Sequence, residues 1–141
     1  MASNSAERIV LLPIQPRFAR SIMTGEKRVE FRKVRFRNEV SHVVVYASSP
    51  IQKILGYFEV CYMDVDSPKE LWTRYNAVAG MLQDEFEAYY ASSTRGVAIG
   101  IGNIRALRKP VPLGTLSESL TAPQGFAYLT EEAFEMIRRC L

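Results

Sequence analysis

Several residue types on which common chemistries depend are scarce in this sequence. The chain has one histidine, His42, and two cysteines, Cys61 and Cys140, which do not form a CxxC pair. A cysteine–histidine zinc site, a histidine-based triad and a two-histidine ribonuclease therefore lack the residues that they need. No apolar run approaches the roughly 20 residues of a membrane helix, and no basic-then-apolar leader precedes the first apolar segment. We expect a cytoplasmic protein with no metal and no cofactor.

Length and composition indicate one ordinary globular domain. The chain has 141 residues, of which 48% are hydrophobic and 23% are charged. That length suffices for a hydrophobic core without disulfides or metals. The first seven residues are mostly small and polar, so we expect 1–7 to be a disordered tail and 8–141 to form a single domain.

Positive charge is concentrated in one segment near the N-terminus. The net charge is +3, yet eight cations lie between positions 17 and 37, against only Glu26 and Glu30. Such clustering is typical of a phosphate-binding surface, although a solvated basic face would have the same composition. The eight cations are Arg17, Arg20, Lys27, Arg28, Arg32, Lys33, Arg35 and Arg37.

The order of predicted elements favours an α+β fold. Strands and helices do not alternate one for one, so a doubly wound parallel sheet is not expected. A small, mostly antiparallel β-barrel with about four helices fits the order better. We predict strands near 8–14, 27–33, 42–48, 51–66 and 95–107, a short strand or turn at 122–129, and helices near 16–24, 67–75, 80–93 and 130–141.

The most charged predicted strand, residues 27–33, has a clear alternation. Val29 and Phe31 point to one face, and Glu30 and Arg32 share the other. A guanidinium is a planar set of donors that suits a phosphate or a carboxylate. A carboxylate can accept from the exocyclic amine of a base, as it does with cytosine. The same two side chains could instead pair with each other and keep the surface neutral.

Gly25, Lys27, Glu30 and Arg32 together spell G-x-K-x-x-E-x-R between a predicted helix and a predicted strand. This pattern resembles the signature of the ASCH domain, a relative of the PUA RNA-binding fold. The likeness extends over most of the chain. The segments LPIQPRFARSIMTGEKRVEFRK, VVVYASSPIQKILGYFEV and APQGFAYL resemble segments of small stand-alone ASCH proteins.

The resemblance implies a five- or six-stranded barrel with a cleft beside the first helix that binds RNA or a nucleotide-like ligand. One bacterial branch of that family hydrolyses N4-acetylcytidine, ribonuclease activity is attributed to other members, and some members have no assigned chemistry. The hydrolase uses a Lys and a Thr from the motif and a Glu from a later helix. Lys27 matches the Lys, but Glu30 stands at the Thr position, and no acid occurs at 77–79.

Further candidates could contribute to the same cleft. Tyr46 and Ser48 end a predicted strand and could present hydroxyls, while Arg17 begins a helix whose N-terminus favours anions. Lys33 could contact phosphate. Gln124 could read a base edge and Phe126 could stack on a base, although Phe126 could equally belong to the core.

Three hypotheses remain open at this level. The first is a module that binds RNA or a modified nucleotide through Arg17, Lys27, Glu30, Arg32 and Lys33. The second is a hydrolase acting on an N4-acylated cytidine or on RNA, with Lys27 and Glu30 in acid–base roles. The third is a regulatory or interaction domain with a protein partner, whose charges are incidental.

Overall fold

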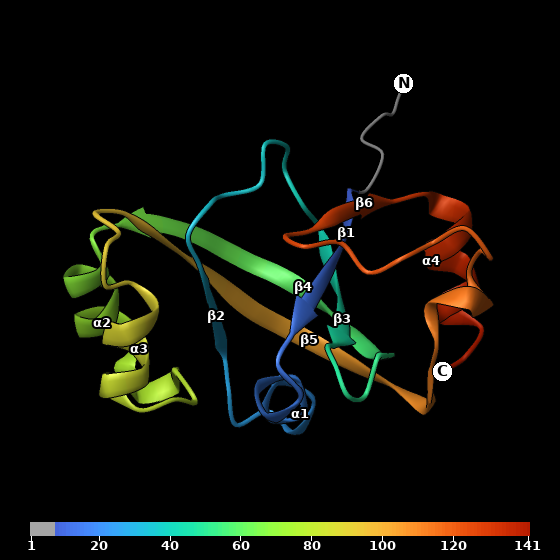
Figure 1. Cartoon of the computed structure of the whole chain (residues 1–141), viewed down its shortest axis with the longest axis horizontal. Helices are drawn as coiled ribbons and strands as arrows, with labels where there is room; N and C mark the ends of the chain where they lie inside the picture. The colour runs from blue at the N-terminus through green and yellow to red at the C-terminus, as the bar shows by residue number, and fades with distance from the viewer. Residues whose placement is uncertain (1–7) are drawn as a thin grey trace.

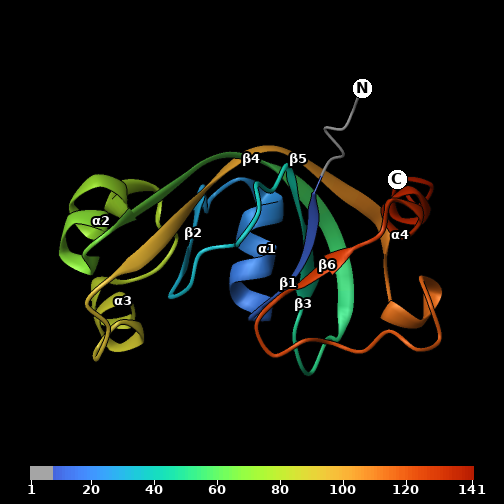
Figure 2. The ribbon, with the colours of Figure 1, turned by 90° about the horizontal axis from the view of Figure 1, so that it is seen from above.

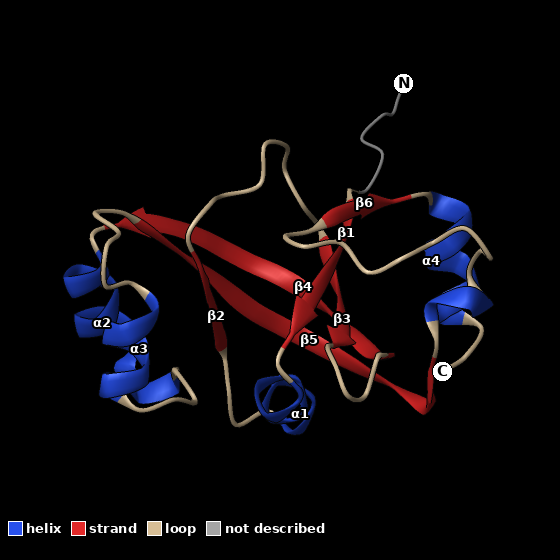
Figure 3. Cartoon of the chain, in the orientation of Figure 1, coloured by secondary structure: helices blue, strands red, loops and turns tan. Residues whose placement is uncertain are grey.

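The computed structural model describes residues 8–141, so the expectation of a disordered tail at 1–7 lies outside the described residues. This part of the chain forms a six-stranded sheet with four α-helices and two short 3₁₀ helices (Figures 1 and 3). In chain order the elements are β1 (Ile9–Ile14), α1 (Pro16–Thr24), β2 (Val29–Arg32), β3 (His42–Ala47), β4 (Lys53–Asp66), α2 (Pro68–Tyr75), η2 (Asn76–Val78), α3 (Gln83–Tyr89), β5 (Gly96–Val111), η3 (Leu113–Thr115), β6 (Ala127–Leu129) and α4 (Glu131–Arg138).

The strand order in the sheet is β2-β5-β4-β3-β1-β6. β1 and β3 are parallel, and every other neighbouring pair is antiparallel. The long strands β4 and β5 run across the whole molecule, from α2 and α3 at one end to α4 at the other (Figure 1). The predicted α+β class with about four helices is therefore confirmed, but the sheet is not a closed barrel.

The sheet stays open because of how its strands are paired. β1 pairs with β3 on one side and with β6 on the other, which leaves it no free edge for β2. β2 pairs only with β5. β4 and β5 arch over α1 and the shorter strands (Figure 2), so the curved sheet brings β2 near β1 without a backbone ladder between them. We call this gap between β1 and β2 the seam.

Buried side chains fill both faces of the sheet. Along β1, Val10 and Leu12 pack into a cluster with α1, while Ile9 and Leu11 pack into a second cluster with α4. A third cluster lies between β2, β5 and the helices α2 and α3. A strand with both faces covered reads as a continuous apolar run, which is why the β1 segment lacks alternation in the sequence.

Local sequence signals place the helix ends. Gly25 follows α1 in a left-handed conformation with φ of 87°, and its N–H donates to the Ile22 carbonyl at 3.1 Å. Such a conformation carries no Cβ penalty in glycine. Ser67 accepts from the Glu70 N–H at 3.3 Å at the start of α2. In residues 8–141, no helix is long and apolar enough to span a bilayer.

Candidate functional site

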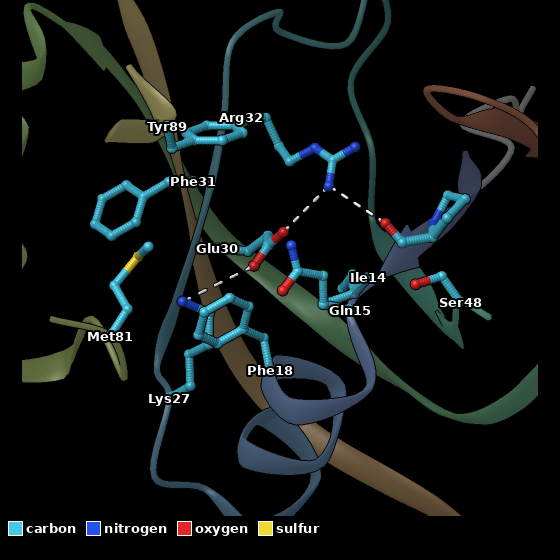
Figure 4. Close-up of a pocket in the computed structure, with 11 residues that line it drawn as sticks. Ile14, Gln15, Phe18, Lys27, Glu30, Phe31, Arg32, Ser48, Met81 and Tyr89 are labelled. Atoms are coloured by element: carbon cyan, nitrogen blue, oxygen red, sulfur yellow. Dashed lines mark hydrogen bonds and ion pairs between the residues drawn. The ribbon is translucent and has the colours of Figure 1, made fainter. Parts of the chain in front are cut away.

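A cavity of ≈210 Å³ opens at the seam between β1 and β2 (Figure 4). Its walls come from β1 and α1 on one side, from β2 on the other, and from the segment around α3 at the mouth. Lys27, Glu30 and Arg32 of the motif all reach it. The lining residues are Pro13, Ile14, Gln15, Phe18, Lys27, Glu30, Phe31, Arg32, Ser48, Met81 and Tyr89.

Lys27 is almost completely buried, with 1% of its surface exposed. Its Nζ donates to the Ala79 carbonyl at 2.5 Å and lies 4.9 Å and 5.6 Å from the ring centroids of Phe18 and Phe31. Burial disfavours the charged amine and lowers the pKa of Lys27, and the charge of Glu30 opposes part of that shift. The amine is therefore a buried, desolvated group beside a single carboxylate of the same strand segment.

Glu30 stands between the two cations of the motif and is only 6% exposed. Its Oε2 accepts from Arg32 Nη1 at 3.3 Å, and its Oε1 lies 4.0 Å from Lys27 Nζ. Within residues 8–141, Oε1 accepts no hydrogen bond. Every buried polar side-chain atom of residues 8–141 has a hydrogen-bond partner, so Oε1, which has none, is exposed to the open cavity. One carboxylate oxygen is therefore fixed by Arg32, and the other is available to a ligand.

Arg32 bridges the seam with its side chain. Nη1 also donates to the Pro13 carbonyl of β1 at 3.3 Å, and Nη2 donates to the Gly125 carbonyl, just before β6, at 3.5 Å. A guanidinium has five N–H donors, so these bonds leave donors on Nη2 and Nε for a ligand. Arg32 thus supports the open side of the sheet and positions Glu30 at the same time.

The predicted alternation along β2 is present in the structure. Val29 and Phe31 pack against the third cluster, where Phe31 meets Phe86 edge to face with ring centroids 4.8 Å apart. Glu30 and Arg32 point to the other face, toward the cavity (Figure 4). Val29 and Phe31 anchor the strand, Glu30 and Arg32 supply the charges of the site, and Phe31 also lines the cavity wall.

Ser48 lines the cavity as a candidate hydroxyl, whereas Tyr46 does not. Tyr46 is 5% exposed and packs with Val44 and Ile54 in the cluster beneath α4. Ser48 lies just beyond the end of β3, so strand alternation does not link it to Tyr46, whose side chain lies on the face of the sheet that packs against α4.

The APQGFAYL segment meets the site through its backbone. Gly125 accepts from Arg32, but the neighbouring Gln124 is exposed and Phe126 packs edge to face on Phe36, with ring centroids 4.7 Å apart. Neither Gln124 nor Phe126 lines the cavity. Phe126 belongs to the core cluster around α1, the alternative that its hydrophobic neighbours allowed.

Arg17 lies beside the site but already has a partner. Its guanidinium forms an ion pair with Glu85 of α3 and lies 4.3 Å from the Phe18 ring centroid. Arg17 lowers the pKa of Glu85, and the charge of Glu85 in turn favours the protonated form of Lys27. Where the hydrolase pattern would have a helix acid near 77–79, the carbonyl of Ala79 accepts from Lys27 instead.

Three wall residues had no functional signal in the sequence. Phe18 fits the apolar stripe of α1, Tyr89 fits the stripe of α3, and Met81, just before α3, fits the apolar pattern of the helix predicted at 80–93, so each is typical of ordinary packing. Lys33 lies just outside the cavity, with its Nζ 4.9 Å from the Tyr89 ring centroid. Within residues 8–141, no cluster of three or more His, Cys, Asp or Glu side chains could hold a metal ion.

The ASCH domain family model matches residues 12–102, and the chain belongs to this family. The ASCH domain-containing ribonuclease of Zymomonas mobilis is 24% identical over 126 residues, which are 86% of this chain and 84% of that protein. The crystal structure of ASCH from Zymomonas mobilis superposes with a TM-score of 0.86 at 23% identity, covering 93% of this chain and 94% of the other. At that identity the superposition shows the shared fold.

A curated relative from Ureaplasma parvum, named ATP synthase subunit alpha, is 28% identical over 128 residues. The match covers 90% of this chain but only 16% of that protein.

Proposed function

We propose that this protein binds RNA or a nucleotide-like ligand, with one base held in the cavity at the seam. The base faces Glu30 and Lys27 and lies among the aromatic side chains of Phe18, Phe31 and Tyr89. Unpaired bases are commonly bound by proteins through ring contacts and hydrogen bonds to their edges. The cavity offers both, together with a net positive charge from Lys27 and Arg32 against one carboxylate.

The free Oε1 of Glu30 is the observation that carries this proposal. Oε1 accepts no hydrogen bond within residues 8–141 and faces the open cavity beside Lys27, so it can accept from a ligand without first losing a hydrogen bond to the protein. An exocyclic amine, such as N4 of cytosine, is a donor that would satisfy it. Lys27 Nζ lies 4.0 Å from Oε1 and Arg32 Nη1 lies 3.3 Å from Oε2, so the two cations orient the carboxylate for that contact.

The comparisons support RNA as the ligand class in particular. The Zymomonas mobilis relative is named a ribonuclease and matches this chain over most of both lengths. The cations beside the cavity suit the phosphates of such a ligand, and Ser48 and Gln15 add neutral polar groups to its wall. Arg17 can bind a phosphate only if its ion pair with Glu85 breaks. Lys33 is exposed near the mouth of the cavity, and Gln124 is exposed next to Gly125.

A second candidate function is hydrolysis of RNA or of an N4-acylated cytidine. The observation that favours it is the buried amine of Lys27, whose lowered pKa makes it a better base, beside Glu30. In this scheme Lys27 and Glu30 exchange a proton with the substrate, while Arg32 holds Glu30 in place.

Titration separates these candidates. The protein is titrated with short single-stranded RNA, cytidine and N4-acetylcytidine at low and high salt, and each mixture is assayed for cleavage or deacetylation. RNA binding should weaken steeply with salt because phosphate contacts release counterions. Glu30→Gln should weaken cytidine by about tenfold or more, since hydrogen bonds to charged groups contribute ~1.5–3 kcal/mol. Arg20→Gln, an exposed α1 cation outside the cavity, is the control.

The outcomes differ for each reading. Salt-sensitive RNA binding that Glu30→Gln reduces, without any product, supports the binding function. Product formation that Lys27→Met abolishes while binding is kept supports the hydrolase. No binding of any of the three ligands, or equal effects of Glu30→Gln and Arg20→Gln, rejects both and leaves an interaction domain.

A further inference from the structure

The cavity is too small to enclose more than part of a nucleotide chain. Its ≈210 Å³ is below the roughly 300–1,000 Å³ of pockets that enclose drug-sized ligands. If one base occupies the cavity, its sugar and the next nucleotide must therefore lie across the rim. The side chains at the mouth decide whether this neighbour is bound.

Tyr89 connects the inside of the cavity with the outer surface. It lines the wall, and 37% of its surface is still exposed. Lys33 is exposed, and its Nζ lies over the Tyr89 ring, 4.9 Å from the ring centroid. When this flexible lysine moves from the ring to the adjoining phosphate, the ring offers a stacking surface to a base and the ammonium supplies the charge for the phosphate.

The Tyr89 ring is held in place by its neighbours. Tyr89 and Tyr90 meet edge to face with ring centroids 4.8 Å apart, and the Tyr90 hydroxyl donates to the Arg32 carbonyl at 2.7 Å. The end of α3 is thereby attached to the end of β2, beside the motif. A ring fixed in this way loses little conformational entropy when a base stacks on it.

Positive charge continues outward from this ring. The segment that follows β2 carries Lys33, Arg35 and Arg37 on the surface. In the described part of the chain, Arg35 and Arg37 have no ion-pair partner. A single strand that leaves the cavity past Tyr89 would therefore meet further cations along this segment.

We propose that Tyr89 and Lys33 form a second nucleotide subsite, in which Tyr89 stacks on the base next to the one in the cavity and Lys33 binds the intervening phosphate. The inference rests on the proposed function and makes it more specific. The preferred ligand is a single-stranded oligonucleotide of at least two nucleotides, and a free nucleoside binds more weakly.

Three probes resolve the subsite by calorimetric titration of the full chain: cytidine, cytidine 3′,5′-bisphosphate and the dinucleotide CpC. The bisphosphate supplies phosphate on either side without a second base. For the unaltered protein we expect CpC to bind at least about fivefold more tightly than the bisphosphate, the low end of base–aromatic stacking. We expect the bisphosphate to bind more tightly than cytidine, with a steeper salt dependence.

Two variants test the assigned residues. Tyr89→Leu should reduce the ratio of CpC affinity to bisphosphate affinity to about one, and Tyr62→Leu, which alters another exposed tyrosine, should keep the ratio. Lys33→Gln should reduce the salt slope of CpC binding by about one phosphate contact, and Lys69→Gln, on exposed α2 surface, should keep it. Lys33 is exposed, so Lys33→Gln remains informative if Tyr89→Leu does not fold.

The failures are distinguishable. If cytidine binds but CpC and the bisphosphate bind equally, or if both variants keep the dinucleotide preference, the subsite is refuted and the cavity function stands. If none of the three probes binds, the proposed function fails, and the subsite fails with it.

Discussion

Replacing Glu30 with glutamine removes the carboxylate that lies between Lys27 and Arg32 in the cavity and keeps the shape of the side chain. Glu30 Oε1 is 4.0 Å from Lys27 Nζ, and both side chains are buried. At that separation the Coulomb attraction is about 4 kcal/mol with an effective dielectric constant of ~20. The loss in the free energy of unfolding is smaller than this attraction, because Lys27 can release its proton once the carboxylate is gone.

We therefore expect Glu30→Gln to lower the free energy of unfolding by about 3 kcal/mol, the low end of the ~3–5 kcal/mol seen when one partner of a buried pair is removed. At roughly 4 °C per kcal/mol for a chain of this length, the melting temperature should fall by about 12 °C. Urea denaturation measures the first quantity and thermal denaturation the second. Glu26→Gln, an exposed acid on the preceding turn, should change stability by less than about 0.5 kcal/mol.

A double-mutant cycle isolates the pair itself. Lys27→Met keeps the volume of the lysine and removes its charge, so adding it to Glu30→Gln should restore about 2 kcal/mol. If the two losses simply add, or if Glu30→Gln costs no more than Glu26→Gln, the buried charges do not depend on one another and the reasoning is refuted.

Three more predictions concern the motif and its support. Burial lowers the pKa of Lys27 from 10.5, so between its folded pKa and 10.5 the unfolded chain binds more protons than the folded protein. Denaturation at increasing pH should therefore show the unaltered protein gaining stability relative to Lys27→Met. A stability difference that stays constant up to pH 10.5 contradicts this. Gly80→Ala places a Cβ 2.7 Å from the Lys27 Cβ at φ of 64° and should cost at least about 1–2 kcal/mol, whereas Gly114→Ala, with open space around it, should not. Thr130→Ala removes the bond to the Ala133 N–H at the start of α4 and should cost about 1 kcal/mol, and Thr130→Ser should retain it, as helix content and urea midpoints would show.

Much of the fold follows from short-range signals. Pro16 and Gly25 bound α1, Ser67 caps α2, and Thr130 caps α4, because each interaction is made within a few residues of the chain. The alternation in β2 was also readable, since strand geometry alone sends Val29 to the core face and Glu30 to the cavity side. The openness of the sheet could not be read from the sequence, because closure depends on which strands share an edge, and residue type along one strand carries no such information.

The site divides in the same way. Lys27, Glu30 and Arg32 occupy one short segment of the amino-acid sequence, and a lysine, an acid and an arginine together suit a polar ligand. The burial of Lys27 against Ala79, the position of Tyr46 on the far face and that of Tyr89 at the mouth follow from the folded arrangement alone. These outcomes rest on contacts between segments tens of residues apart, such as the bond from Lys27 to Ala79. Such contacts depend on how the sheet curves in three dimensions, which no local pattern specifies.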